Sequence, residues 1–98
     1  MARSIVTQTI ERTSRGSGTG LGTPWKVIVL NDSHNTFEGV AATLSRVLPN
    51  LSYDQGRRIA DRIHSSGRAI VWSGHRELAE LYWTGLSESG LTMAPLEQ

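Results

Sequence analysis

The sequence predicts one small α+β domain, in which a three-stranded antiparallel sheet packs against three helices in the order β-α-α-β-α-β. Two observations lead to this prediction. Short apolar runs typical of strands alternate with longer segments whose apolar residues recur at helical spacing. The chain has 98 residues, of which 38% are hydrophobic, and this suffices for one small core. A stretch rich in Gly, Ser and Thr over residues 13–24 predicts a flexible tail at 1–23 and a folded domain at 24–98.

The first strand is expected at residues 27–30, where β-branched and aliphatic side chains follow one another. A helix should begin directly afterwards, because Asn35 is a good N-cap and Glu38, three residues on, can reach back to the cap. Pro49 should end this helix. Its inward face carries apolar residues at helical spacing, namely Phe37, Val40, Ala41, Leu44, Val47 and Leu48.

A second helix should start with the capping box formed by Ser52 and Gln55. Gly67 stands where a left-handed residue commonly ends a helix. One face of this helix carries Gly56, Ile59, Ala60, Ile63 and His64.

The second strand is expected at residues 69–72. A third helix should run from Gly74 to Gly90. The last strand is expected at 91–94, and Pro95 suggests that it lies at a sheet edge. The residues of the third helix expected to face inward are Leu78, Leu81, Tyr82, Gly85 and Leu86.

The composition excludes several classes of protein. The chain has no cysteine, so it can form neither a disulfide nor a thiolate metal site. A formal net charge of +1 is too small to indicate a nucleic-acid-binding protein. No apolar run approaches the length of a membrane span, and the first residues lack the apolar region of a signal peptide. We therefore expect a soluble cytoplasmic protein that has neither nucleic acid nor membrane as a partner.

A polar cluster follows the first strand without a gap: Asn31, Asp32, Ser33 and His34. Side chains at the open end of a buried strand are held by the core yet face solvent, so they could bind a ligand. An ordinary turn would use the same residue types. His64 could likewise be a core histidine with one hydrogen bond, or a ring nitrogen that faces a pocket at the cluster.

The same residues match no catalytic pattern that would indicate an enzyme. Ser33, His64 and Asp32 include the types of a hydrolase triad, but no nucleophile-elbow pattern accompanies them. The spacing of His34, His64 and Asp32 matches no metal motif. The glycine-rich stretch neither follows a strand nor precedes a lysine, as a phosphate-binding loop would. We expect no catalytic residue, no metal and no cofactor.

Five motifs follow one another over residues 24–97: Trp-Lys-Val-Ile-Val-Leu-Asn-Asp, Phe-Glu-Gly-Val, Ile-His-Ser-Ser-Gly-Arg-Ala, Glu-Leu-Ala-Glu and Gly-Leu-Thr-Met-Ala-Pro-Leu-Glu. In this order they resemble the ClpS adaptor family, and the residues near the first helix and at the C-terminus are most similar to its cyanobacterial branch. Each is weak alone, but their common order and spacing are specific.

The resemblance implies a non-enzymatic adaptor. Such an adaptor binds proteins that begin with a bulky hydrophobic residue, an N-terminal degron, and delivers them to a Clp-type AAA+ unfoldase and its protease. A protonated α-amino group needs hydrogen-bond acceptors, which Asn31 and an unprotonated His64 can offer. By position, the resemblance places the α-amino group at Asn31, Asp32, Ser33 and His64. It places the hydrophobic pocket at Val29, Asn35, Phe37, Val40, Ala60, Ile63 and Leu91.

The resemblance also implies a surface near Glu77 and Tyr82 that faces the N-terminal domain of a ClpC-like or ClpA-like unfoldase. The chain departs from the family at several of these positions. Ser33 replaces a common second acid, which predicts weaker capture of the ammonium because charge-assisted hydrogen bonds are the stronger ones. Phe37 and Ala60 stand where many members have methionine, so the preferred first residue could differ. Tyr82 replaces a lysine found in some members.

Two other readings stay open. The chain could dock on an unfoldase and alter its substrate choice without recognising degrons, a reading that the neutral Ser33 favours. It could also be a ribosomal stalk-type domain of related architecture, although no factor-binding helix is identifiable in the sequence.

Overall fold

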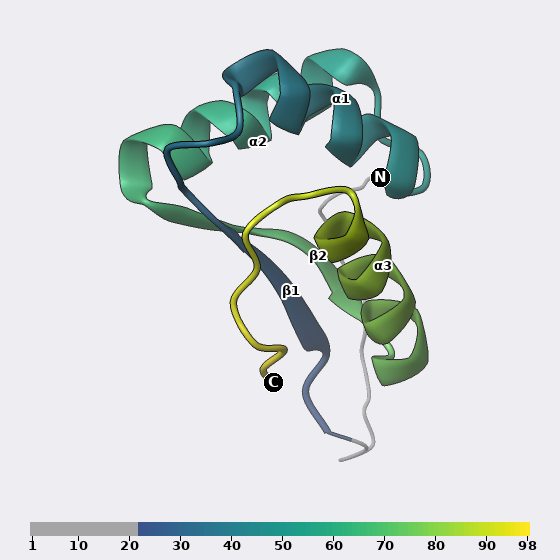
Figure 1. Cartoon of the computed structure of the whole chain (residues 1–98). Helices are drawn as coiled ribbons and strands as arrows, with labels where there is room; N and C mark the ends of the chain where they lie inside the picture. Colours follow the sequence, from purple (N-terminus) through teal and green to yellow (C-terminus); the bar gives the residue numbers. More distant parts are fainter. Residues whose placement is uncertain (1–21) are drawn as a thin grey trace.

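A computed structural model describes residues 22–98, so all but the last two residues of the predicted tail at 1–23 lie outside the described part. Three helices and an antiparallel pair of strands are present, which confirms the α+β prediction in these respects (Figure 1). In chain order the elements are β1 (Trp25–Leu30), α1 (Phe37–Val47), α2 (Tyr53–Ser66), β2 (Arg68–Gly74) and α3 (Arg76–Glu88).

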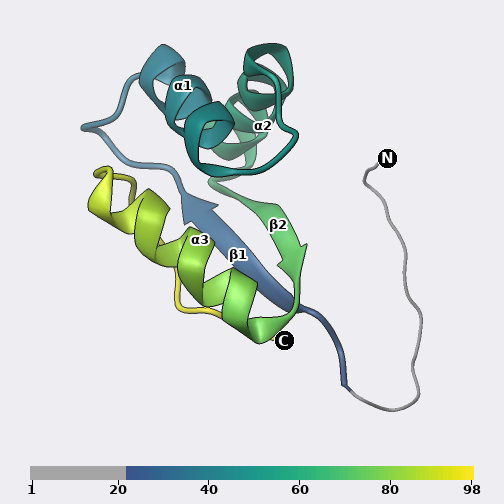
Figure 2. The same cartoon turned by 90° about the vertical axis from the view of Figure 1, so that its right-hand side faces the viewer.

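The helices cover the strand pair from two sides. Helices α1 and α2 pack against each other beyond one end of the strands, and α3 packs along β1 and β2 (Figures 1 and 2). One buried cluster joins all five elements, and its members include Val27, Val29, Val40, Ala41, Leu44, Ile59, Ala60, Ile63, Val71, Ala79 and Leu86. This core holds the end of β1 in place where the chain leaves the strand.

The two strands pair from Trp25 opposite Gly74 to Leu30 opposite Arg68. The register shifts between Val27 and Ile28, so that β2 contributes one extra residue there and the pair forms a β-bulge. The rest of the ladder is regular, and it fixes the position at which β1 ends and the polar cluster begins.

The predicted third strand at 91–94 is wrong as a regular strand. The C-terminal segment lies along the free edge of β1 but pairs with it only through two isolated antiparallel bridges, Val29 with Met93 and Lys26 with Glu97. Val29 and Lys26 are three positions apart, whereas Met93 and Glu97 are four apart, so the register slips between the two bridges and a continuous ladder does not form.

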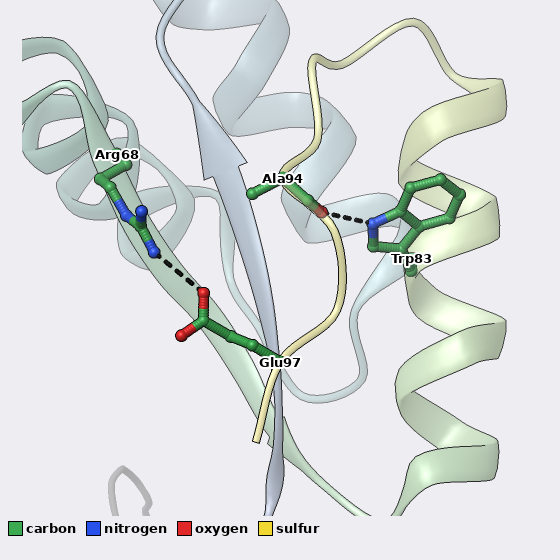
Figure 3. Close-up of polar contacts among 4 residues, drawn as sticks. All are labelled: Arg68, Trp83, Ala94 and Glu97. Carbon is green, nitrogen blue, oxygen red and sulfur yellow. Dashed lines mark hydrogen bonds and ion pairs between the residues drawn. The ribbon is translucent and has the colours of Figure 1, made fainter.

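Side chains fasten this C-terminal segment to its neighbours (Figure 3). The indole Nε1 of Trp83 donates to the carbonyl oxygen of Ala94 over 2.8 Å, which joins α3 to the segment. Arg68 and Glu97 form an exposed ion pair at 3.4 Å. Exposed pairs of this kind contribute little to stability, so the buried side of the segment and its backbone bonds hold it in place.

The ends of α1 and α2 follow local sequence signals, with one correction. The capping box of Ser52 and Gln55 is formed, and Gly67 ends α2 in the left-handed region at a φ of 88°, both as predicted. The N-cap of α1 is Thr36 and not Asn35, since the Thr36 side chain accepts from the backbone N–H of Gly39 over 2.9 Å. Asn35 makes other bonds, described below.

Helix α3 differs most from expectation. It begins after His75 rather than at Gly74, and its fully buried residues are Ala79 and Leu86. Leu78 and Leu81 were expected to face inward but are 41% and 62% exposed. Tyr82 packs against the core, with its ring edge-on to Trp72 at 5.0 Å between centroids. Apolar residues therefore occur on both sides of this helix.

Candidate functional site

A small hollow opens where β1 ends. Its walls come from β1, the loop after it, α1, α2 and the segment that follows α3. The space around it, open solvent included, amounts to about 200 Å³, so the hollow is small. The lining residues are Val29, Leu30, Asn31, Asp32, Asn35, Val40, Ile63, Leu91 and Thr92.

Backbone hydrogen bonds on both sides hold the end of β1. The N–H of Leu30 donates to the carbonyl of Thr92 over 2.8 Å. The N–H of Asn31 donates to the carbonyl of Gly67 over 2.9 Å, and Gly67 in turn donates to Ile63. Asn31 is thereby fixed beside the C-terminus of α2 while the residue itself stays exposed. Its side-chain amide stands at the rim of the hollow, where it could meet a ligand.

The carboxylate of Asp32 is surrounded by donors from its own loop and from the C-terminal segment. Oδ1 accepts from the backbone N–H groups of His34, at 2.9 Å, and Asn35, at 2.8 Å. Oδ2 accepts from the side-chain amide of Asn35 at 2.8 Å and from the hydroxyl of Thr92 at 2.5 Å. The Asn35 backbone N–H, then the Thr92 hydroxyl and the Asn35 amide, hold the pKa of Asp32 well below its usual range.

The side-chain amide of Asn35 has a defined orientation in this network of hydrogen bonds. Its Nδ2 donates both to Asp32 Oδ2 and to the carbonyl of Gly90, the latter over 3.0 Å. Both partners can only accept, so the nitrogen must face them and the amide oxygen must face away. Asn35 lines the hollow and is half-buried. Its contribution to a ligand is therefore an acceptor.

Apolar side chains make the inner wall. Val29, Val40, Ile63 and Leu91 are buried, and each comes from a different element. Two residues expected in the wall are placed elsewhere. Ala60 is buried in the core but is not among the lining residues. The ring of Phe37 lies under the guanidinium of Arg57, 5.6 Å from its carbon, at the start of α1.

His64 and Ser33 are also outside the lining of the hollow. Both are exposed, so the expectation that His64 lies on the buried face of α2 is wrong. His64 directly follows Ile63, which does line the hollow, and it precedes Gly67, which bonds to Asn31. The fold thus brings Asn31 and the last turn of α2 to the same rim, with the imidazole on its solvent side.

Glu77 and Tyr82 both lie on α3, and the hollow is lined by other parts of the fold. Glu77 is exposed and Tyr82 is half-buried. The exposed Leu78 and Leu81 lie on the same helix, so its free side is more apolar than was expected.

Sequence reasoning missed Thr92 and Leu30 as lining residues. Thr92 belongs to the Gly-Leu-Thr-Met motif, but its bond to Asp32 spans 60 positions of the chain, and no local pattern could reveal it.

The site combines polar residues, among them Asn31 and Asn35, with an apolar inner wall. Across residues 22–98, no three side chains of His, Cys, Asp or Glu gather closely enough to hold a metal ion. Within the same described part of the chain, no helix has both the length and the apolar character that crossing a membrane requires.

Comparison with known proteins gives a consistent result. The model of the family described as "ATP-dependent Clp protease adaptor protein ClpS" matches residues 22–96. The ClpS adapter protein of Thermosynechococcus vestitus is 52% identical over 74% of this chain and 78% of its own length. The ClpS of a Nostoc species is 49% identical over 74% of this chain and 75% of its own length. Both relatives come from cyanobacteria, as the residues of the motifs predicted.

A solved structure agrees with these sequence matches. The structure of Agrobacterium tumefaciens ClpS2 bound to L-phenylalaninamide aligns with a TM-score of 0.66 at 31% identity. The alignment covers 76% of this chain and 96% of that chain. The relatives are adaptors of a protease and not catalysts, in keeping with the lack of an enzyme motif. The chain belongs to the ClpS family of Clp protease adaptor proteins.

Proposed function

We propose that this adaptor binds the first residue of proteins that begin with a bulky hydrophobic side chain and delivers them to a Clp-type AAA+ unfoldase and its protease. The observation that carries the proposal is the hollow at the end of β1, which combines an apolar inner wall with the Asn31 amide at its rim. A chain terminus offers the matching pair of features, an apolar side chain beside a protonated amine.

The amine would be met by acceptors at the rim. The amide oxygen of Asn31, the hydroxyl oxygen of Ser33 and an unprotonated ring nitrogen of His64 can each accept one of its hydrogen bonds. None of these three groups carries a negative charge, so ammonium capture should be weaker than with a second carboxylate at position 33. The requirement for a free amine would exclude internal segments of a protein, which have none.

The first side chain would enter the apolar part of the hollow. Val29, Val40, Ile63 and Leu91 would contact it, and Asn35 would form part of the wall. We assign Phe37 and Ala60 supporting positions: Phe37 would border the mouth, and Ala60 would set the packing behind Ile63. The entry of an apolar first side chain is supported by the related structure, whose ligand L-phenylalaninamide has both an α-amino group and an apolar side chain.

Delivery would use a different surface. We propose that α3 docks on the N-terminal domain of a ClpC-like or ClpA-like unfoldase, with Glu77 and Tyr82 in the contact. The exposed Leu78 and Leu81 support this assignment, because they extend the same helix with apolar area. Docking on α3 would leave the hollow open for the degron.

Peptides that differ only in their first residue test the binding role. Leu-, Phe-, Tyr- and Trp-initiated peptides should bind more tightly than an Ala-initiated one, and acetylation of the amine should abolish binding. Equal affinity for all, or binding that survives acetylation, would refute the proposal. Isothermal titration with the full chain gives the affinities directly.

The second candidate is a modulator that docks on the unfoldase without recognising degrons. The neutral Ser33 and the small size of the hollow favour it. Capture by an unfoldase N-terminal domain, together with no measurable peptide affinity, would establish this alternative.

A further inference from the structure

Asp32 has no free position for the amine of a bound peptide. A carboxylate offers about four lone-pair positions, two on each oxygen. In this chain each oxygen of Asp32 already accepts two hydrogen bonds from the protein. An ammonium could approach only by displacing one of these donors, and each donor would then need a new partner.

The bond from Thr92 to Asp32, together with a bond from Asn35 to Gly90, joins two walls of the hollow. Asp32 and Asn35 belong to the loop after β1, whereas Gly90 and Thr92 belong to the segment after α3. Two side-chain bonds cross between them, Thr92 Oγ1 to Asp32 Oδ2 at 2.5 Å and Asn35 Nδ2 to the Gly90 carbonyl at 3.0 Å. We call these four residues the clasp. Asn35, and Leu91, which lies between Gly90 and Thr92, both line the hollow.

Resting on the function proposed above, we infer that Asp32 is a positioning residue and not an amine ligand, and that the clasp sets the separation of the two walls and so the size of the first side chain that the hollow accepts. The loop after β1 lacks helical or strand hydrogen bonds of its own between Asn31 and Thr36. Apart from the backbone bond between Leu30 and Thr92, the clasp supplies the hydrogen bonds that join this loop to the segment carrying Leu91.

The clasp also explains why polar residues line an otherwise apolar pocket without a cost in stability. Their donors are paired inside the protein, so they need not be satisfied by the ligand. The Asp32 charge is stabilised by those donors, which is consistent with the lowered pKa of its carboxyl group. Within the clasp, the amide oxygen of Asn35 stays available as an acceptor for the bound residue.

Thr92 offers a matched pair of variants that tests the clasp. Thr92→Val keeps the shape of the side chain but removes the hydroxyl that reaches Asp32, whereas Thr92→Ser keeps the hydroxyl. Thr84→Val, an exposed substitution on α3, controls for the change from Thr to Val itself. The full chain is titrated with Leu- and Trp-initiated peptides of otherwise equal sequence.

Thr92→Val should weaken binding of the Leu-initiated peptide by about two- to tenfold, the equilibrium effect of one hydrogen bond. The Trp-initiated peptide should lose less, because the Leu91 wall can then move outward. The affinity ratio of Trp to Leu should rise, while Thr92→Ser and Thr84→Val should keep the ratio of the unmodified protein. An unchanged ratio in Thr92→Val, or an equal change in Thr92→Ser, would overturn the inference.

Amide hydrogen exchange without peptide separates this inference from the proposed function. The backbone N–H of Asn35 donates to Asp32, so its exchange should become faster in Thr92→Val while that of Gly56 in α2 stays the same. If the unmodified protein binds no peptide, the degron role fails, yet the exchange result still reports on the clasp. Unchanged exchange at Asn35 would show that Thr92 does not hold the loop.

Discussion

Gly56 is the point of closest approach between α1 and α2, and its replacement by alanine is expected to destabilise the domain. A Cβ atom at this position would lie 2.6 Å from the carbonyl oxygen of Ala41 and 3.3 Å from its Cα. These are backbone atoms of α1, so no side-chain rotation can relieve the contact. The two helices would have to move apart, and with them Val40 and Ile63, which line the hollow.

Two opposing terms set the magnitude. Alanine is favoured over glycine inside a helix by about 0.8–1.0 kcal/mol, which alone would stabilise α2. Overpacking of a tight contact costs about 1–3 kcal/mol. Because the obstructing atoms belong to backbone, the cost should lie in the upper half of that range, and a net loss of about 1–2 kcal/mol follows. At about 4–8 °C per kcal/mol for a small domain, the melting temperature should fall by roughly 4–16 °C.

Gly85→Ala is the matched control. It is also a helical glycine, but its Cβ would meet the Cγ1 atom of Val47 at 3.0 Å, and this is a side chain at the end of α1 that can shift. Urea unfolding of both variants measures the difference. Gly85→Ala should change the free energy of unfolding by less than about 1 kcal/mol. If Gly56→Ala proves as stable as Gly85→Ala, the close approach of α1 and α2 is not as the structure has it.

Two further predictions concern the rim and the loop. His64→Ala should weaken binding of a Leu-initiated peptide by about 1 kcal/mol, which is the low end for a lost hydrogen-bond partner because His64 is exposed. Ser65→Ala, on the same helix turn, should leave the affinity unchanged. Equal affinities of the two variants would remove His64 from the site. The folded-state pKa of Asp32 lies below that of the unfolded chain, so its stabilisation is complete above the unfolded value and is lost as pH falls below about 5. Urea unfolding over this pH range should show a smaller loss of unfolding free energy in Asp32→Asn than in the unmodified protein. The same dependence of unfolding free energy on pH in both proteins would contradict the hydrogen bonding of the carboxylate.

Local signals in the sequence were sufficient for much of the fold. The capping box of Ser52 and Gln55 and the left-handed Gly67 depend only on neighbouring residues, and both are formed as predicted. The apolar run of β1 is buried at Val27, Ile28 and Val29, as a central strand requires. These elements place the end of β1, which is why the polar cluster could be located from sequence.

The misplaced features depended on competition between residues. Asn35 and Thr36 are both good N-cap residues, and the structure uses Thr36, while the side-chain nitrogen of Asn35 donates to Asp32 and Gly90. The last strand is not continuous because its register against β1 slips between the two bridges. Neither outcome is visible from propensity alone, since each depends on which partner is near in space.

The site was predictable in part for the same reason. Apolar periodicity placed Val40 and Ile63 on inward helix faces, and the resemblance to the ClpS family assigned them to the pocket; both line the hollow. It also suggested an inward His64 and inward Leu78 and Leu81, although all three are exposed. Apolar and amphipathic residues spread around more than one side of these helices, and periodicity does not determine which side packs against the strands.

The hollow is proposed to receive the first residue of another protein through its side chain and its free amine together. Titration with Leu-initiated, Ala-initiated and acetylated Leu-initiated peptides measures both contacts. The unmodified Leu-initiated peptide should bind, the Ala-initiated one should bind more weakly, and acetylation should abolish binding. Equal affinities for the three peptides would contradict it.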